Sequence, residues 1–167
     1  RLGFLGANVE GYGCAGMSNV EYGLVMQEIE RGDSGLRSFV SVQSALVMYP
    51  ILTFGSDEQK RRWLPKLQSG EAIGCFGLTE PGFGSNPPGM LTGARREGAG
   101  WVLDGEKTWI TNGRVADSAA VWARAGNGVR ASLGDVGSPA WTPPAPPATR
   151  PREPSLPSTT AAPTHSS

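Results

Sequence analysis

The apolar pattern of the sequence changes its period near residue 70, and this change limits the folds open to the chain. Before it, two capping boxes open amphipathic helices, one at Ser18 with Glu21 and one at Ser56 with Gln59. After it, short apolar runs bounded by Gly and Pro are typical of strands. Helices followed by strands predict an α+β fold, or a helical domain and a separate β domain.

Two helices are predicted between residues 18 and 50. The first ends at Gly32, and its apolar residues recur at i, i+3, i+4 and i+7: Tyr22, Val25, Met26 and Ile29. Asp33 or Ser34 caps the second, which we expect Pro50 to close. The apolar face of that second helix holds Leu36, Phe39, Val40, Leu46 and Val47. Both faces predict core packing.

A third helix is predicted from Ser56 through Trp63 and Leu64 towards Gly70, with Pro65 expected to kink or end it. Residues 72–78 then suit a buried strand, 81–93 a loop, and 119–123 another strand. Residues 101–103 and 107–110 flank Asp104-Gly105, a strong hairpin signal.

The last part of the chain has a different composition. Of fourteen prolines, nine lie between residues 139 and 163. From Ala131 onward large apolar residues are nearly absent, so this stretch cannot bury enough surface to offset the entropy of ordering. We therefore predict disorder over 131–167. A Pro-rich ligand for an SH3 or WW-type domain is the functional alternative.

Charge and residue usage exclude several classes of function. Fifteen basic residues balance fifteen acidic ones, which argues against general attraction to nucleic acid or an anionic membrane, and no apolar run is long enough to cross a bilayer. The chain has a single histidine, His165, so a His-ligated metal site or a His-based triad is improbable.

Two distant cysteines, Cys14 and Cys75, favour an intracellular, reducing compartment. The first residues do not resemble a targeting peptide, and without an initiator Met the numbering is expected to start inside a longer protein.

Two segments carry the chemistry. In residues 74–85 a buried strand enters a turn rich in Gly and hydroxyl groups, which displays backbone N–H groups suited to a planar ligand or a phosphate. Residues 107–112, Lys-Thr-Trp-Ile-Thr-Asn, place an indole beside hydroxyl and amide groups. Each also has a structural interpretation, because Gly-rich turns solve backbone problems and a Trp in a hairpin packs on the next sheet.

Together the two segments resemble one family. Gly-Leu-Thr-Glu-Pro at 77–81, then Gly84-Ser85, then residues 107–112, resemble the flavin-binding signature of acyl-CoA dehydrogenases. The resemblance covers roughly residues 2–130. It implies part of an N-terminal helical domain at 1–70 and the first, flavin-binding part of a middle β domain at 71–130, followed by the tail at 131–167.

The resemblance implies FAD as cofactor and assigns residues to it. Thr79 and the adjacent backbone would bond the pyrimidine edge of the isoalloxazine, Trp109 would pack on the ring, and Thr111 would bond near the nitrogen that accepts hydride. Ser85 would also reach the substrate. The residues implied at the cofactor are Phe76, Gly77, Leu78, Thr79, Glu80, Pro81, Gly84, Ser85, Trp109, Ile110 and Thr111. Glu80 is not the base in this family, and Phe83 and Asn86 depart from its pattern.

Residues 28–44 resemble the segment of glutaryl-CoA dehydrogenases that binds the distal carboxylate of the acyl chain. Carried over, the substrate-binding residues are Arg37 and Ser38, with Ser41 one turn further along. A guanidinium can hold a carboxylate with two hydrogen bonds. From the residues alone, a solvated helix Arg paired with Asp33, four positions earlier, is the favoured interpretation of Arg37, and only the family resemblance reverses this preference.

The family implies more than the chain contains. Its reaction is α,β-dehydrogenation of an acyl-CoA, and the glutaryl type then loses CO2 to give crotonyl-CoA, with electrons passing to an electron-transfer flavoprotein. The Glu base and the interface of a homotetramer belong to a C-terminal helical bundle that is not recognisable after Arg130, so no catalytic residue is assigned and little activity is expected. A reading-frame change near codon 130 would account for the tail.

Two other functions remain open. One is a non-catalytic fragment with a disordered interaction tail, and the other an acyl-CoA dehydrogenase for an unsubstituted acyl chain. The expected location is the cytoplasm in a bacterium, or the mitochondrial matrix in a eukaryote, where the glutaryl type serves lysine and tryptophan degradation.

Overall fold

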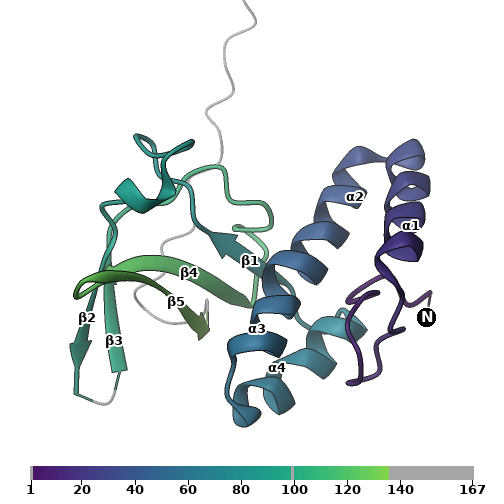
Figure 1. Cartoon of the computed structure of the whole chain (residues 1–167), viewed down its shortest axis with the longest axis horizontal. Coiled ribbons are helices and arrows are strands. Elements are labelled where there is room, and N and C mark those ends of the chain that lie inside the picture. Colours follow the sequence, from purple (N-terminus) through teal and green to yellow (C-terminus); the bar gives the residue numbers. More distant parts are fainter. Residues whose placement is uncertain (1, 99, 136–167) are drawn as a thin grey trace, which may run out of the picture.

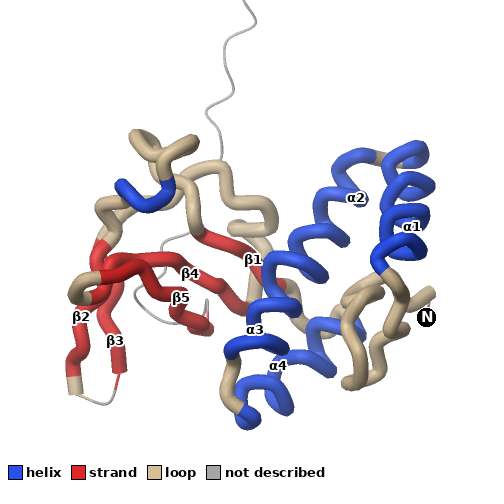
Figure 2. The backbone as a smooth tube through the Cα atoms, in the orientation of Figure 1, coloured by secondary structure: helices blue, strands red, loops and turns tan. Residues whose placement is uncertain are grey.

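Helices occupy one side of the molecule and a five-stranded sheet the other (Figure 1). The computed structural model describes residues 2–98 and 100–135. Strand β1 (Gly74–Gly77) lies next to the helices, whereas β2 (Gly93–Glu97) and β3 (Gly100–Asp104) lie farthest from them (Figure 2). The α+β fold, with helical residues preceding a β domain, is confirmed.

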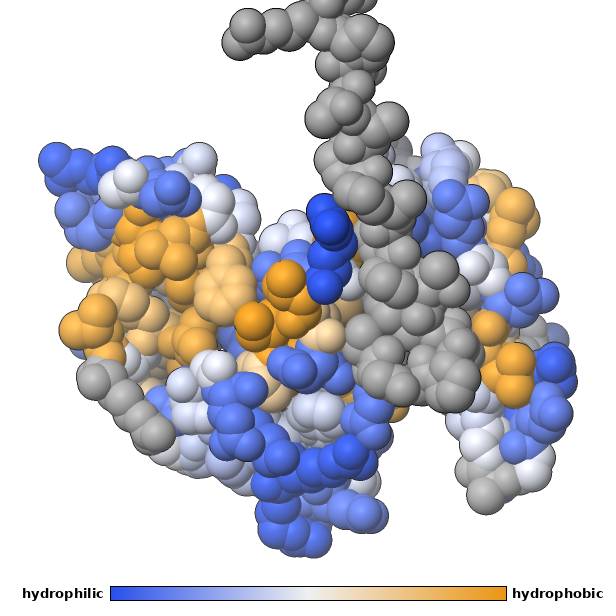
Figure 3. All heavy atoms as spheres, turned by 180° about the vertical axis from the view of Figure 1, so that it is seen from behind, coloured by the Kyte–Doolittle hydropathy of each residue, from blue (hydrophilic) through white to orange (hydrophobic). Residues whose placement is uncertain are grey.

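Helix α1 (Asn19–Gly32) begins at the predicted capping box. The Ser18 N–H donates to the Glu21 carboxylate at 2.7 Å, and the Glu21 N–H donates to Ser18 Oγ at 3.3 Å. The predicted apolar face is the one that turns inward, but its residues are only half-buried, and the main packing partner of α1 is α2 (Ser34–Ser41). Val20 and Leu24 are exposed, and Figure 3 shows hydrophobic residues gathered on this helical side.

The next three helical segments follow one another without a break. They are α2 (Ser34–Ser41), the π-helical η1 (Val42–Met48) and α3 (Tyr49–Phe54). Asp33 caps α2, as predicted, by accepting the Leu36 N–H at 2.7 Å. Of the apolar face predicted for this helix, Val40 and Val47 are buried, whereas Leu36 and Leu46 are exposed. We call the continuous helix from Ser34 to Phe54 the rod.

Pro50 does not close the rod, contrary to the prediction. In an α-helix its ring would clash with the carbonyl four residues earlier, and one hydrogen bond would be lost. Here the Tyr49 N–H donates to Ser44 O, five residues back, so the turn that meets the proline is widened. Pro50 then takes a place in the first turn of α3, where no N–H is needed.

Helix α4 (Asp57–Ser69) confirms the capping box at Ser56 and Gln59 and ends at Gly70 in the left-handed region. Pro65 lies inside the helix and does not end it. Trp63, Leu64 and Leu67, on both sides of the proline, are buried, and this packing holds the helix together across it.

The main core lies between the rod, α4 and the N-terminal segment. It consists of Val9, Val42, Val47, Met48, Ile51, Trp63, Leu64, Leu67 and Ala72. The fully buried Gln43 connects it to the sheet, since its amide donates to Leu67 O and Ala72 O and accepts the Gly74 N–H at 2.8 Å. These bonds fix the start of β1 against the rod.

The sheet has the order β1-β4-β2-β3, and β5 pairs with β4 as well. Strand β4 (Ser118–Ala125) runs parallel to β1, with Gly74 opposite Ser118. Strands β2 (Gly93–Glu97) and β3 (Gly100–Asp104) are antiparallel. The strands predicted at 72–78, 101–103 and 119–123 are therefore confirmed, whereas β2 had no predicted counterpart.

The hairpin predicted around Asp104-Gly105 is wrong. The partner of β3 is β2, and residues 107–110 form no strand. A Cβ on Gly105 would lie 2.5 Å from Thr92 Oγ1, so the chain packs tightly at this point. It then runs back to β1, where the Thr108 N–H donates to Thr79 O at 2.9 Å. A long-range contact thus replaces the local pairing.

The boundary predicted at residue 130 is also wrong, because residues 131–135 belong to β5 (Gly128–Asp135). This strand pairs with β4 along its whole length, and Leu133 packs against the main core. Its Arg and Gly residues are exposed and give no apolar pattern typical of a strand, because the strand is stabilised by backbone pairing. The rest of the predicted disordered tail, 136–167, lies outside the described residues.

Within residues 2–98 and 100–135, no helix combines the length and apolar character needed to span a membrane.

Candidate functional site

A cavity of about 330 Å³ lies where the rod, the end of β1 and the segment after β3 meet. It is lined by Val42, Leu46, Phe76, Leu78, Thr79, Trp109, Ile110 and Thr111. The last six are residues for which the family resemblance implies flavin contact, and they come from two segments that are distant in sequence. The wall is mainly apolar, with the two threonines as its hydroxyl-bearing members.

Backbone and side-chain hydrogen bonds hold the two segments together. The Thr108 N–H donates to Thr79 O at 2.9 Å, beside the cavity. At the other end of the second segment, Asn112 Nδ2 donates to Gly74 O at 3.1 Å. Residues 108–112 are thereby fixed along β1, which explains how Trp109 and Thr111 come to face the same cavity as Thr79.

Trp109 combines two features that are unusual for a large apolar residue. Its side chain is 89% exposed, and its φ of 58° lies in the left-handed region, which costs a bulky residue roughly 1–3 kcal/mol. The hydrogen bonds on both sides of it hold this conformation. The indole therefore offers a flat apolar face that the described residues leave largely uncovered.

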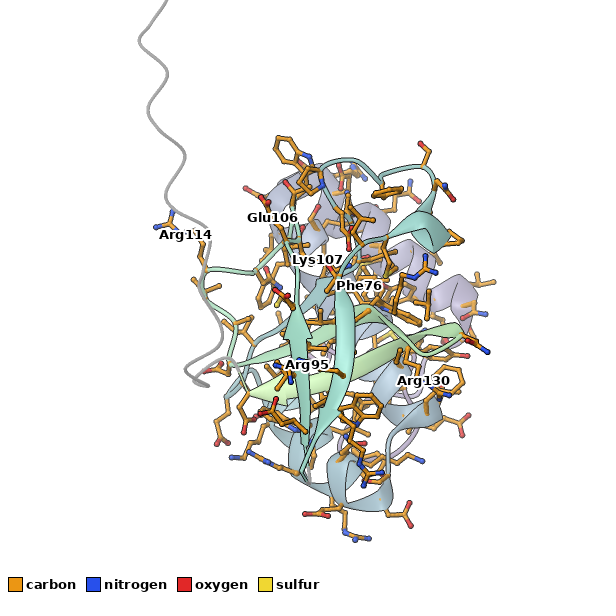
Figure 4. All side chains as sticks on the ribbon, turned by 90° about the vertical axis from the view of Figure 1, so that its left-hand side faces the viewer. Phe76, Arg95, Glu106, Lys107, Arg114 and Arg130 are labelled. Atoms are coloured by element: carbon orange, nitrogen blue, oxygen red, sulfur yellow. The ribbon has the colours of Figure 1, made fainter. Side chains whose placement is uncertain are left out.

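A buried ion pair lies directly behind the cavity wall. Lys107 Nζ donates to Glu80 Oε1 at 2.9 Å and to Leu78 O at 3.0 Å, and the two side chains are 7% and 4% exposed. Figure 4 shows Lys107 within the body of the molecule, whereas Arg114 lies at its edge. The Glu80 carboxylate also accepts the N–H groups of Leu91, at 2.6 Å, and Thr92, at 2.9 Å.

These contacts keep Glu80 ionised. Burial by itself raises the pKa of the Glu80 carboxyl, but the hydrogen bonds from Leu91, Thr92 and Lys107 outweigh it and lower this pKa to about 2. A carboxylate with such a low pKa is a poor proton acceptor at neutral pH. Its environment agrees with the expectation that Glu80 is not a base.

The other residues implied at the cofactor do not line the cavity. Gly77 lies on the opposite face of β1, where a Cβ would meet Lys107 and Val121 at 3.5 Å. Glu80 points inward to its donors, while Pro81, Gly84 and Ser85 are exposed in the loop that follows. The flavin contacts implied for these five residues remain predictions, and so does the substrate contact of Ser85.

The residues implied at the substrate carboxylate lie on α2. The Arg37 guanidinium pairs with Glu30 of α1, and neither side chain is buried. The alternative partner, Asp33, instead caps α2, so that pairing is wrong. Ser38 and Ser41 are half-buried, and Ser38 precedes the cavity residue Val42 by one helical turn.

Sequence reasoning missed the contribution of the rod to the cavity. Val42 was assigned to no face, and Leu46 was expected in the core, yet both line the cavity. The widened turn of η1 changes the apolar period at this point, and a π-helical segment inside a helix frequently marks a functional site. Gln43 and Lys107, which position the two walls, were not assigned roles either.

Family models match both parts of the chain. Residues 1–71 match the acyl-CoA dehydrogenase N-terminal domain, and residues 75–138 match the acyl-CoA dehydrogenase middle domain. The chain belongs to the acyl-CoA dehydrogenase family. The resemblance first based on residues 77–85 and 107–112 is thereby confirmed.

Three acyl-CoA dehydrogenases illustrate the relationship. The glutaryl-CoA dehydrogenase from Mycobacterium smegmatis in complex with FADH2 is 59% identical, with a TM-score of 0.81 over 83% of this chain and 36% of that one. A glutaryl-CoA dehydrogenase–glutaryl-CoA complex is 37% identical, with a TM-score of 0.76 over 80% of this chain and 36% of that one. The human mitochondrial short-chain specific acyl-CoA dehydrogenase is 46% identical over 123 residues, or 73% of this chain and 30% of the human protein. The chain spans about a third of the length of these relatives.

Proposed function

We propose that the cavity binds the isoalloxazine ring of FAD and that the protein acts as an FAD-dependent acyl-CoA dehydrogenase of the glutaryl-CoA type. The observation that carries the proposal is the meeting of Thr79, Trp109 and Thr111 at one cavity. The 59% identity to a glutaryl-CoA dehydrogenase described in complex with FADH2 supports both the cofactor and the subfamily.

The cavity fits this cofactor. A flavin ring needs a flat apolar surface to stack on, which Trp109 provides, and Phe76 and Leu78 add apolar wall. Its polar edge needs directed hydrogen-bond donors, for which the hydroxyls of Thr79 and Thr111 are suited. Donors at a ring edge also favour the reduced form, because they stabilise developing negative charge.

The chemistry divides between the cofactor and the protein. When bound, FAD supplies an acceptor for the hydride that leaves the β-carbon of the acyl group. A carboxylate must remove the α-proton, and no carboxylate of the described residues lines the cavity. The base therefore comes from outside this wall, and in the glutaryl type loss of CO2 follows.

We further propose an electron-transfer flavoprotein as electron acceptor, a homotetrameric assembly, and the mitochondrial matrix as location if the protein is eukaryotic.

The proposed preference for glutaryl-CoA as substrate depends on the residues where α1 and α2 meet. The Arg37–Glu30 pair is half-exposed, and pairs of this kind contribute only about 0–1 kcal/mol. Arg37 can therefore exchange Glu30 for the distal carboxylate of the substrate at small cost, with Ser38 and Ser41 as additional donors.

Binding of FAD is the direct test. The chain is mixed with FAD, freed of excess cofactor, and examined by absorbance and fluorescence. Stoichiometric flavin with altered spectra is the expected result, and Trp109→Ala should weaken binding. No retained flavin would refute the proposed site. Dye reduction by glutaryl-CoA should be negligible for the chain alone.

The 46% identity to the short-chain specific enzyme favours one alternative, an unsubstituted acyl-CoA as substrate. Replacing the Arg equivalent to Arg37 by Ala in a full-length relative separates the two. If the glutaryl assignment is right, activity on glutaryl-CoA falls sharply while activity on butyryl-CoA is retained. Equal losses on both substrates would favour the alternative.

A further inference from the structure

The buried pair of Glu80 and Lys107 lies at the junction of the two cavity walls. Glu80 directly follows Thr79, and Lys107 precedes Trp109 by two residues, so each partner belongs to one wall. Lys107 reaches across to Leu78 O as well as to the carboxylate. The pair, together with the Thr108–Thr79 backbone bond, thus connects the walls from behind.

The carboxylate also organises the loop between the walls. Its Oε2 accepts the Leu91 N–H, and its Oε1 accepts the Thr92 N–H together with Lys107 Nζ. An amide side chain has a single acceptor oxygen and would turn its NH2 group towards one of these donors. Glutamine therefore cannot reproduce the contacts of Glu80, although it has the same shape.

We propose that Glu80 and Lys107 are positioning residues, which set the affinity of the cavity for flavin by holding Thr79 and Trp109 at a fixed separation. The proposal depends on flavin binding at this cavity, as proposed above. Neither residue lines the cavity, so the pair acts through the backbone on which Thr79 and Trp109 are mounted.

Glu80→Gln and Lys107→Met, singly and together, test the proposal in the 167-residue chain. The dissociation constant for FAD is measured by fluorescence, the spectrum of bound flavin is recorded, and folding is followed by circular dichroism. The matched control is the exposed pair Lys66–Glu71, whose side chains are 51% and 67% exposed, altered as Lys66→Met and Glu71→Gln. It loses the same charges at two residues that do not line the cavity.

Each single variant should weaken FAD binding about tenfold or more, change the spectrum of bound flavin, and act non-additively in the double variant, since the two residues work as a unit. The controls should remain within about twofold of wild type. Folded variants with the affinity and spectrum of wild type would overturn the proposal. A wild-type chain that binds no FAD would instead refute the flavin site itself, and the positioning role with it.

A single variant that does not fold is replaced by a measurement on the wild-type chain. Binding of FAD should slow hydrogen exchange at the amides of Leu91, Thr92 and Thr108, because these bonds connect the pair to the cavity. Exchange slowed at these amides supports the proposal, and exchange unchanged there in the presence of bound FAD overturns it.

Discussion

Two ion pairs flank the proposed ligand sites, and they differ in almost every physical respect. Lys107–Glu80 is nearly inaccessible and has further backbone partners on both sides. Arg37–Glu30 joins two helices at the surface, with 37% and 46% of the side chains exposed. A buried pair cannot lose one member without leaving an unpaired charge in the interior, whereas water readily replaces either member of the exposed pair. The first pair therefore suits a fixed framework, and the second suits exchange with a charged ligand.

The largest expected effect comes from breaking the buried pair. Lys107→Met or Glu80→Gln should lower the free energy of unfolding by about 3–5 kcal/mol. Urea denaturation of each variant measures this, and Glu71→Gln, at an exposed pair, should change it by less than about 0.5 kcal/mol. A small loss at position 107 would mean that the two pairs do not differ in the way described.

Acid should weaken the buried pair next. The pKa of Glu80 is about 2 in the folded chain and about 4.5 in the unfolded chain, so its contribution is complete above about pH 4.5 and is lost as the pH falls towards 2. On the order of 3 kcal/mol is involved. Stability measured between pH 6 and pH 2 should fall more steeply in the wild type than in Glu80→Gln. Parallel curves would contradict the assignment.

A third prediction concerns the junction of the rod and β1, which supports one wall of the cavity. A Cβ on Gly74 would lie 2.5 Å from Val47 Cγ1, so Gly74→Ala should destabilise the chain by about 1–3 kcal/mol. Thermal unfolding measures the loss. Gly84→Ala is the matched control, because nothing lies within 4 Å of its Cβ position. Equal melting temperatures for both variants would refute the close packing.

The smallest effect on stability is expected at the exposed pair. Arg37→Ala and Glu30→Gln should each change the free energy of unfolding by no more than about 1 kcal/mol. In chemical denaturation both variants should nearly overlay the wild type. A loss similar to that of Lys107→Met would show that Arg37 is a structural residue and not one free to bind a ligand.

Local signals in the sequence were sufficient to predict where the helices begin. The capping boxes at Ser18 and Ser56 and the N-cap at Asp33 are satisfied within a few residues, so their geometry follows from the adjacent chain. The motifs at 77–81 and 107–112 were likewise sufficient to identify the family. Six residues in and around them meet at one cavity, and the flavin contact that the resemblance implies for them stays a prediction.

Structural features that depend on contacts between distant parts of the chain could not be predicted from the sequence. The passage of the rod through Pro50 depends on the wider turn of η1, and β5 depends on pairing with β4. The segment after Asp104-Gly105 turns towards β1 because Lys107 and Thr108 find partners there. A local turn signal cannot compete with such contacts when a buried charge must be paired.

The sequence by itself determined the helix starts, the order of the helical and β parts, and the residue types that surround the cavity. Only the tertiary structure decided that Val42 and Leu46 complete that cavity. It also decided the ion-pair partners, Lys107 for Glu80 and Glu30 for Arg37. The physical reason is one of range. Capping and periodicity act within one or two turns, but burial, strand pairing and charge partners are settled when distant segments meet.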